Sequence, residues 1–320
     1  MRVLFWGTPE FAAAPLRALI GEGFEVIGVV TQPDKPQGRS RDVKSPPVKQ
    51  VALEESIPCF QPASLRDPEF VETITVMSPD ISVVVAYGRI LPRRVIDLPR
   101  LGTLNIHASL LPALRGAAPI QAALRQGFTE TGVTIMRMVP ALDAGPIILR
   151  AAVPVLDDET YGELQIRLAE LGAVALIEAL ALISVGEARD TPQDDSLATY
   201  APKVTREEAR IDWFGDANDA ARTIRAFDPR PGAFTTLNGV DVKFYGPRTV
   251  ELTSQPPAPG QLPWVQPLPG TVLSTDDGVT VVCLGSLLRV AEVQPAGKKR
   301  MSSAQWARGR GVKAGDRFGV

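Results

Sequence analysis

A single histidine and a nearby amide are the residues of this sequence best suited to chemistry. His107 is the only histidine among 320 residues, and Asn105 precedes it by two positions. An imidazole has an unperturbed pKa of about 6.5, so it exchanges protons near neutral pH. Residues two apart on an extended strand project to the same side. An amide beside an imidazole suits a carbonyl oxygen that becomes an oxyanion, for which one such donor is worth about 3 kcal/mol.

Asp143 is the third candidate and lies in a predicted turn at residues 142–146. A carboxylate near the imidazole would fix its tautomer or handle the proton that leaves an attacking amine. The three side chains together predict addition to a carbonyl group without a covalent enzyme intermediate. Asp143 and His107 each have a structural alternative, because aspartate is common in turns and a lone histidine is often a hydrogen-bonded structural residue.

The elements that must position these residues follow a β-α-β pattern. Thr8 is expected to cap the first helix. His107 and the loop from Tyr87 to Leu91 follow two strands at their carboxyl ends, where open α/β sheets bind ligands. We therefore expect side chains from these strand ends to converge with Asp143. The strands are expected at residues 2–5, 24–30, 57–60, 81–86, 102–106, 133–138 and 147–153, and the helices at 11–20, 46–55, 70–77 and 121–126.

Several motifs of common α/β enzymes are missing. Only Gly7 follows the first strand, where a dinucleotide-binding fingerprint needs three glycines, and no GxxxxGK[ST] sequence occurs. No serine stands in a GxSxG sequence. The sequence therefore disfavours a nicotinamide enzyme, a P-loop enzyme and an α/β-hydrolase.

The composition is that of an ordinary globular protein, with 45% hydrophobic and 22% charged residues. No apolar run reaches the roughly 18 residues of a membrane span, and the first residues form a strand pattern rather than a signal peptide. Cys59 and Cys283 lie far apart and outside any metal-binding spacing. We expect a cytoplasmic protein with no metal site and no membrane contact.

The pattern changes from helical to short alternating runs in the second half of the chain. Thr160 and Glu163 form a capping-box pattern before a long predicted helix that ends near residue 182. Two dipeptides, Asn238-Gly239 and Asp277-Gly278, are hairpin signals. These patterns predict a first domain at residues 1–187, a polar linker at 188–207 and a second domain at 208–320. The second domain is expected to be a small barrel, of which the OB fold is one candidate.

Two segments are rich in basic or polar residues. Residues 31–47 form a long polar stretch that includes Arg39 and Arg41, and loops of this length tend to be functional. The net charge is −2, yet seven basic residues stand against Asp316 alone after residue 295. Such an excess predicts a polyanionic partner, and its alternative is a solvated basic tail. The basic residues are Lys298, Lys299, Arg300, Arg308, Arg310, Lys313 and Arg317.

These residues and motifs closely resemble the methionyl-tRNA formyltransferase family, part of a larger family that uses 10-formyltetrahydrofolate. The resemblance spans almost the whole chain. The Asn-x-His pair with a distant aspartate is shared across folate-dependent formyltransferases, whereas the Arg-Gly-Ala-Ala-Pro run is more specific. The motifs that carry it are 105–112, 115–121, 131–136 and 142–145, together with 7–9, 31–34, 84–88, 203–213 and 294–299.

The resemblance implies a Rossmann-like formyltransferase domain with a predominantly parallel sheet, followed by an OB-type β-barrel that binds tRNA. It implies transfer of a formyl group from 10-formyltetrahydrofolate to the free α-amino group of methionyl-initiator tRNA, with no metal and no obligate protein partner. The implied catalytic residues are Asn105, His107 and Asp143. The implied folate-contacting residues are Ser109, Leu110, Leu111 and Pro112, with Gly88, Arg89, Ile90 and Leu91 as a pocket wall. The implied tRNA-contacting residues are Arg39, Arg41, Lys298, Lys299 and Arg300.

Two other functions remain as alternatives. A formyltransferase that acts on an amino-sugar nucleotide would use the same three catalytic residues, but it would have little reason for a basic carboxyl-terminal segment. A non-enzymatic RNA-binding protein would have no need of Asn105, His107 and Asp143, yet all three are present. The sequence leaves open the role of the proline-rich stretch at residues 254–270.

Overall fold

The computed structural model describes residues 1–37, 42–250 and 267–319. The chain forms two compact units, each assembled from separate segments. Unit 1 comprises Met1–Pro119, Thr129–Pro154 and Leu164–Pro202, and unit 2 comprises Ile120–Phe128, Val155–Glu163 and Lys203–Val320. The domain boundaries inferred from the sequence, at residues 187 and 207, stay a prediction.

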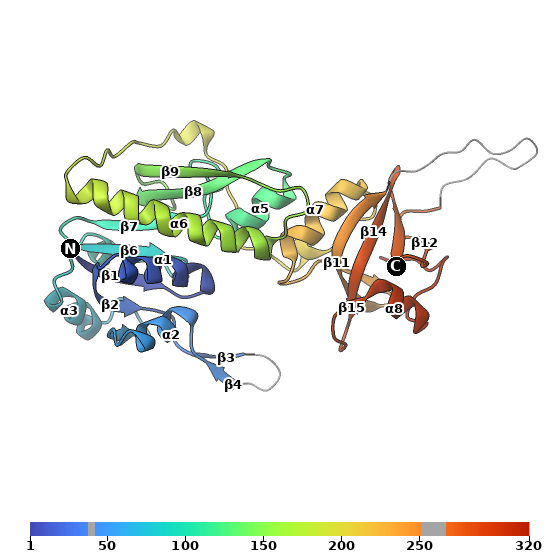
Figure 1. Cartoon of the computed structure of the whole chain (residues 1–320), viewed down its shortest axis with the longest axis horizontal. Coiled ribbons are helices and arrows are strands. Elements are labelled where there is room, and N and C mark those ends of the chain that lie inside the picture. Colours follow the sequence, from blue (N-terminus) through green and yellow to red (C-terminus); the bar gives the residue numbers. More distant parts are fainter. Residues whose placement is uncertain (38–41, 251–266, 320) are drawn as a thin grey trace, which may run out of the picture. The chain divides into compact units, whose positions relative to one another are not determined.

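Unit 1 contains a seven-stranded sheet in the order β5-β2-β1-β6-β7-β8-β9 (Figure 1). The neighbours from β5 to β7 are parallel, whereas β8 is antiparallel to both β7 and β9. The predicted α/β class with a predominantly parallel sheet is therefore confirmed. The strands are β1 (Arg2–Gly7), β2 (Glu25–Val30), β5 (Cys59–Phe60), β6 (Ile81–Val85), β7 (Thr103–His107), β8 (Glu130–Arg137) and β9 (Ile147–Pro154).

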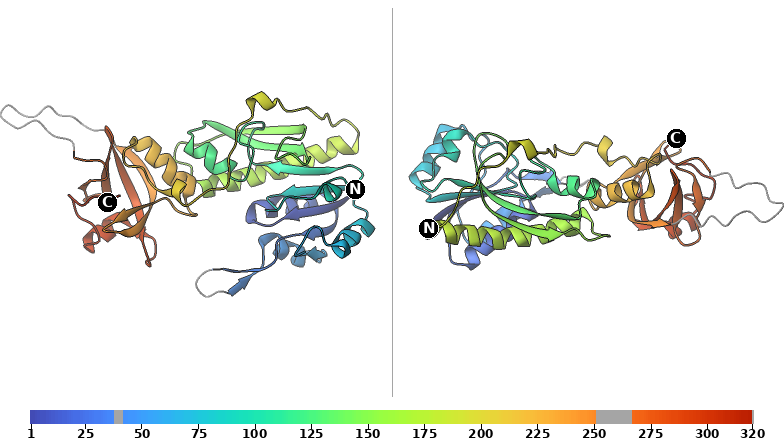
Figure 2. Two further views of the ribbon diagram at one scale, coloured as in Figure 1. Left: turned by 180° about the vertical axis from the view of Figure 1, so that it is seen from behind. Right: turned by 90° about the horizontal axis from the view of Figure 1, so that it is seen from above.

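Helices cover both faces of this sheet, because strands such as β6 are buried along their whole length. Helices α3 (Pro68–Val76) and α4 (Arg93–Ile96) pack on one face in a cluster that includes Trp6 and Val84. Helices α1 (Glu10–Gly21) and α6 (Tyr161–Ser184) run along the other face, as the two orientations in Figures 1 and 2 show. Helix α2 (Pro47–Glu54) contacts α1.

The structure confirms one of the two predicted helix caps and contradicts the other. At α6 the Thr160 amide donates to Oε2 of Glu163 at 2.9 Å, and the Glu163 amide donates to Oγ1 of Thr160 at 3.3 Å, which is the predicted capping box. Thr8 does not cap α1, whose first turn follows Pro9 without a side-chain cap. The Thr8 hydroxyl instead donates to the carbonyl of Tyr87 at 3.1 Å, because that carbonyl lies at the adjoining strand end.

The long segment after β2 is not without structure. Strands β3 (Lys35–Gln37) and β4 (Asp42–Lys44) pair as a two-stranded antiparallel sheet. Arg39 and Arg41 lie between them and outside the described residues. Sequence periodicity missed the hairpin because each of its strands has only three residues.

Unit 2 contains an antiparallel sheet in the order β10-β11-β14-β13-β12, with β15 paired to β14. The predicted hairpin at Asn238-Gly239 joins β10 to β11, and the one at Asp277-Gly278 joins β12 to β13. The second, β-rich domain is thus confirmed, and its OB type stays a prediction. The strands are β10 (Phe234–Leu237), β11 (Val240–Val250), β12 (Val272–Ser274), β13 (Val279–Cys283), β14 (Ser286–Pro295) and β15 (Met301–Ser302).

Helices α7 (Ala217–Phe227) and α8 (Ser303–Arg308) pack against this sheet through a core that includes Phe227, Phe244 and Phe318. Helix α5 (Pro119–Arg125) and two short 3-10 helices, Asp195–Leu197 and Glu207–Ala209, complete the elements. Residues 254–266 of the proline-rich stretch lie outside the described residues. No helix of the described chain is long and apolar enough to cross a membrane.

Candidate active site

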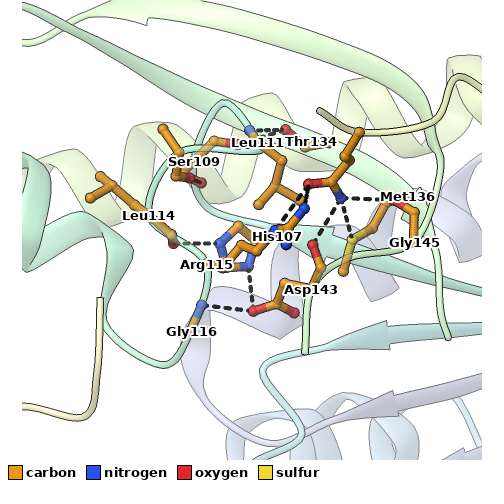
Figure 3. A network of polar contacts seen from close by, with 12 residues as sticks. His107, Ser109, Leu111, Leu114, Arg115, Gly116, Thr134, Met136, Asp143 and Gly145 are labelled. Atoms are coloured by element: carbon orange, nitrogen blue, oxygen red, sulfur yellow. Dashed lines mark hydrogen bonds and ion pairs between the residues drawn. The ribbon is translucent and has the colours of Figure 1, made fainter. Parts of the chain in front are cut away.

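His107 is the last residue of β7 and is almost fully buried, with 6% of the residue exposed. Its Nε2 lies 2.9 Å from the carbonyl oxygen of Leu114 (Figure 3). A carbonyl oxygen only accepts hydrogen bonds, so Nε2 carries a proton and donates it. This bond fixes the plane of the ring and leaves Nδ1 as the nitrogen available for chemistry.

Asp143 faces that remaining nitrogen from a different segment of the chain. Its Oδ2 lies 3.7 Å from His107 Nδ1 and accepts a hydrogen bond of 2.8 Å from the backbone amide of Gly116 (Figure 3). The separation of 3.7 Å is too long for a hydrogen bond, but the two groups form an ion pair whenever the imidazole is protonated. The predicted approach of Asp143 to His107 is thus observed.

The route by which Asp143 arrives differs from the expectation of converging strand ends. Because β8 is antiparallel to β7, its last residue, Arg137, lies opposite Leu104 at the start of β7. The loop after β8 therefore leaves at the amino end of β7 and folds back to reach His107. Gly145 permits this fold, since a Cβ there would overlap the carbonyl oxygen of Arg137. The sequence could not show the reversed direction of β8.

Asn105 lies on β7 two residues before His107 and is half-buried. It lies opposite Val84 on one side and Met136 on the other. Strand alternation directs Asn105 and His107 toward the face covered by α3 and α4, because Val84 packs in the cluster on that face. Within residues 1–37, 42–250 and 267–319 the Asn105 carboxamide makes no hydrogen bond, so its amide protons are available to a ligand.

Hydrogen bonds that involve Ser109, Leu111 and Thr134 are among those that hold the turn after His107, residues 109–112. The Leu111 amide donates to Thr134 Oγ1 at 3.1 Å, Thr134 Oγ1 donates to the Ser109 carbonyl at 2.7 Å, and Ser109 Oγ donates to the Ala113 carbonyl at 2.6 Å (Figure 3). The peptide bond between Leu111 and Pro112 is cis. Ser109 and Leu111 are buried and Leu110 is half-buried, so this turn is a fixed surface beside the histidine.

The loop after β6 divides into an exposed part and a buried part. Gly88, Arg89 and Ile90 are exposed, with Ile90 at 89%, whereas Leu91 is buried in the same cluster as Trp6. Arg89 Nη1 donates to the backbone carbonyls of residues 62 and 63 at 3.2 and 2.9 Å. Ile90 is therefore an apolar side chain left open to a ligand, and Leu91 anchors the loop.

Tyr87 opens this loop and is the site residue with a marked electrostatic shift. Its ring packs edge-on against Trp6 at 5.4 Å, and its buried hydroxyl has no hydrogen-bond partner in the part of the chain that the structure describes. Burial raises the pKa of the Tyr87 phenol, and the nearby charge of Arg89 opposes this only in part. The hydroxyl therefore stays protonated at neutral pH.

Sequence reasoning missed two residues that hold the site. Gln193 Nε2 donates to the backbone carbonyls of Asp143 and Gly145 at 2.8 and 2.7 Å, and Thr199 Oγ1 accepts from the Leu114 amide at 2.8 Å. Both residues lie in the polar stretch interpreted as a linker. Such a stretch has no periodicity, so no signal in the sequence marks its contacts.

The candidate tRNA-contacting residues of unit 2 differ in their environments. Lys298 and Lys299 are exposed. Arg300 is bound within the unit, because its guanidinium donates to Asp228 at 3.0 Å and to Glu292 at 2.7 Å and lies 3.9 Å from the centre of the Tyr245 ring. Among the described residues, no group of three or more His, Cys, Asp or Glu could hold a metal ion.

Comparison with known proteins identifies both halves of the chain. The family model described as "Formyl transferase" matches residues 1–180, and the one described as "Formyl transferase, C-terminal domain" matches residues 203–311. The two matches together cover unit 1's sheet and most of unit 2.

Curated relatives align over nearly the whole chain. The methionyl-tRNA formyltransferase of Aromatoleum aromaticum is 47% identical over 319 residues, which are 99% of this chain and 97% of the relative. The methionyl-tRNA formyltransferase of Methylococcus capsulatus is 46% identical and covers 100% of both chains. That of Geobacillus thermodenitrificans is 43% identical and covers 97% of this chain and 95% of the relative.

Solved structures share the fold at lower identity. HypX from Aquifex aeolicus, in complex with tetrahydrofolic acid, has a TM-score of 0.63 and 20% identity over 95% of this chain, and the match spans 46% of HypX. The N-formyltransferase of Helicobacter canadensis, in complex with folinic acid and dTDP-3-aminofucose, has a TM-score of 0.67 and 14% identity, with coverage of 92% and 98%. The solved structures show the shared fold, whereas the sequence matches show the family. With 43–47% identity over at least 97% of its length, the chain belongs to the methionyl-tRNA formyltransferase family.

Proposed function

We propose that this chain transfers the formyl group of 10-formyltetrahydrofolate to the free α-amino group of methionyl-initiator tRNA. The observation that carries the proposal is the His107–Asp143 pair, in which one ring nitrogen is fixed by Leu114 and the other faces a carboxylate at 3.7 Å. Family membership indicates the reaction, and the geometry of the His107–Asp143 pair indicates which groups carry it out. We also assign the protein to the cytoplasm, where initiator tRNA is used.

The reaction joins the amine nitrogen to the formyl carbon. The tetrahedral intermediate bears a negative charge on the former carbonyl oxygen, and Asn105 and His107 are the side chains that stabilise this charge. Asn105 suits the role because its amide has no other partner in the described chain. His107 presents only Nδ1, so the oxyanion must lie on the side of the ring away from Leu114.

Asp143 handles the proton that the attacking amine loses. The carboxylate orients and stabilises a protonated His107 and accepts the amine proton directly or through water. The proton passes to N10 of the folate as the bond between N10 and the formyl carbon breaks, so the amine becomes an amide and the folate leaves as tetrahydrofolate. Positioning of the two substrates supplies much of the remaining acceleration.

Two surfaces of unit 1 are proposed to hold the folate. The turn at residues 109–112 is a fixed edge beside His107, and the loop at residues 88–91 places the exposed Ile90 against solvent. A folate has a flat apolar ring system with polar edges, and an exposed apolar side chain suits such a ring system. HypX and the Helicobacter N-formyltransferase, which share the fold, were solved with folates.

The tRNA is proposed to meet basic residues outside the catalytic loop. Lys298 and Lys299 are exposed and available to phosphates. Arg39 and Arg41 lie outside the described residues, and their contact with tRNA stays a prediction from the family resemblance. Arg300 is the weakest of these candidates, because its charge is already paired with two carboxylates.

An amino-sugar nucleotide is the competing acceptor. Structural neighbours with 14–16% identity include sugar N-formyltransferases, so the fold alone does not choose between acceptors. The three relatives described above, at 43–47% identity, are named methionyl-tRNA formyltransferases, which favours tRNA.

The experiment presents the protein with 10-formyltetrahydrofolate and either methionyl-initiator tRNA or an amino-sugar nucleotide, and determines the mass of the product. Formylmethionine released from the tRNA, with no formylated sugar, is the expected result. Formylation of the sugar alone would overturn the proposed acceptor, and the absence of both products would overturn the proposed reaction.

A further inference from the structure

Residues 193–201, which we call the backing segment, bind both the turn that contains Asp143 and the residue that accepts a hydrogen bond from His107. The backing segment lies within unit 1, more than 45 residues after Asp143 and more than 80 after His107. Its peptide groups pair with the loop after β7, and an isolated parallel bridge joins Arg115 to Tyr200. The Arg115 amide donates to the Thr199 carbonyl and the Ala201 amide donates to the Arg115 carbonyl, both at 2.8 Å.

Gln193 holds the carboxylate side of the pair. Its Nε2 donates to the carbonyls of Asp143 and Gly145, on both sides of the turn that presents the carboxylate. Asp143 has a φ of 48°, in the left-handed region, which aspartate tolerates better than most residues but still at some cost in backbone strain. The Gln193 carboxamide is therefore positioned to keep this turn in its strained conformation.

Arg115 fixes the Gln193 side chain in turn. The guanidinium is buried, with 4% of the side chain exposed, and donates to Gln193 Oε1 through Nη2 at 2.8 Å and Nε at 3.1 Å. It also donates to Asp195 at 2.7 Å, whose side chain is 81% exposed. Because Arg115 binds the Gln193 oxygen Oε1, the side chain is oriented with its Nε2 protons toward the turn that contains Asp143.

Thr199 holds the histidine side of the pair. Its Oγ1 accepts from the Leu114 amide at 2.8 Å, and the carbonyl of Leu114 accepts from His107 Nε2 at 2.9 Å. The imidazole is therefore linked to the backing segment through a single residue. A shift of Leu114 would rotate the ring that carries Nδ1.

We propose that Gln193 and Thr199 are positioning residues for the formyl transfer, and that the backing segment sets the separation of 3.7 Å between His107 Nδ1 and Asp143 Oδ2. The expected effect on kcat rests on the proposed function. The expected effect on the separation of His107 and Asp143 is independent of the substrate, because the contacts are internal to unit 1. The segment has a catalytic role in addition to joining the two halves of the chain.

The test compares four variants of the full chain without a histidine tag. Gln193→Met removes the donors without adding charge. Gln50→Met makes the same substitution at an exposed glutamine of α2, whose Nε2 donates to the Ser45 carbonyl, and serves as the matched control. Thr199→Val removes the hydroxyl, and Thr199→Ser restores it. We expect kcat to fall about 10- to 100-fold for Gln193→Met and Thr199→Val, with the KM values for both substrates and the thermal unfolding temperature little changed. Gln50→Met and Thr199→Ser should retain the wild-type kcat.

A spectroscopic readout separates this inference from the proposed function. His107 is the only histidine, so its ring-nitrogen NMR signals need no assignment. We expect the Nε2 signal of the wild type to be that of a nitrogen that carries a proton, and we expect Thr199→Val and Gln193→Met to displace the ring-nitrogen signals while both controls leave them in place. If wild type fails to formylate methionyl-tRNA but the signals move as expected, the proposed function fails and the positioning stands. If wild type is active and neither kcat nor the signals change in the two variants, the positioning is overturned.

Discussion

At the scale of single residues, the site depends on backbone groups as much as on side chains. Leu114 acts through its carbonyl, which binds His107 Nε2, and Gly116 acts through its amide, which binds Asp143. Leu114 and Gly116 contribute backbone groups, which every residue has, so their residue types did not reveal these contacts. The sequence predicted that His107 and Asp143 meet, and backbone geometry determines which ring nitrogen remains available.

Gly116 is the residue whose substitution tests this backbone contact. Its φ of +121° is unfavourable for other residues, and a Cβ there would lie 2.6 Å from the carbonyl oxygen of Ala201. We expect Gly116→Ala to cost about 1–3 kcal/mol in the free energy of unfolding and to lower kcat, because the amide would move away from Asp143. Urea denaturation and steady-state kinetics measure the two effects.

Gly23→Ala is the matched control for Gly116→Ala. Gly23 has a φ of +76° with nothing within 4 Å of an added Cβ. It should lose stability from backbone strain alone and keep the wild-type kcat. Equal kcat values in the two variants would show that the amide of Gly116 does not position Asp143.

At the scale of elements, sequence motifs predicted correctly those features that depend on contacts between neighbouring residues. The capping box at Thr160 and Glu163 and the Asn238-Gly239 turn were predicted from neighbouring residues and are present. Thr8 carries an equally good local signal, yet its hydroxyl binds Tyr87, which is 79 positions away. Tertiary contacts override local preference at that position, and sequence spacing contains no record of them.

The capping box gives a pH-dependent prediction at this scale. Hydrogen bonds from the Thr160 hydroxyl and amide lower the pKa of Glu163 below its usual 4.5. A carboxyl group with a lowered pKa stabilises the fold above its unfolded-state pKa, and this stability is lost as the pH falls through the lowered value. We expect Glu163→Ala to cost about 0.5 kcal/mol at pH 7 and progressively less below pH 4.5.

Thermal unfolding of wild type and variant at pH 7 and pH 3 measures this difference. Glu163→Gln is the control, because glutamine keeps the hydrogen-bond acceptor but does not ionise in this range. Its difference from Glu163→Ala should be the same at both pH values. A loss in Glu163→Ala that stays constant with pH would show that the charge of Glu163 does not contribute to the cap.

At the scale of the whole molecule, composition and pattern predicted an α/β half and a β-rich half, but not the way that each unit is assembled. Residues 120–128 and 155–163 belong to the second unit although they precede residues 164–202, which belong to the first unit. Residues 193–201, interpreted as a linker, also bind the segment after His107 and the turn that contains Asp143. Long-range pairing decides both features, and neither changes the periodicity of the sequence.

The basic residues of unit 2 give a prediction at this scale. We expect Lys298→Ala combined with Lys299→Ala to weaken tRNA binding and to reduce the dependence of log Kd on log salt by about two units at most. Arg300→Ala should chiefly lower thermal stability, by about 1–3 kcal/mol, because it leaves the nearly buried Asp228 without its partner. Salt titrations of tRNA binding and thermal unfolding distinguish these roles. A larger loss of salt dependence in Arg300→Ala than in the lysine variant would reverse this assignment.

The most direct test of the account is the single-turnover rate of formyl transfer from 10-formyltetrahydrofolate to methionyl-initiator tRNA, measured for wild type and for His107→Ala. We expect formylmethionyl-tRNA from the wild type and a rate lower by about 100-fold or more in the variant, with tRNA affinity retained. A variant as fast as the wild type, or a wild type that binds both substrates and forms no product, would contradict it.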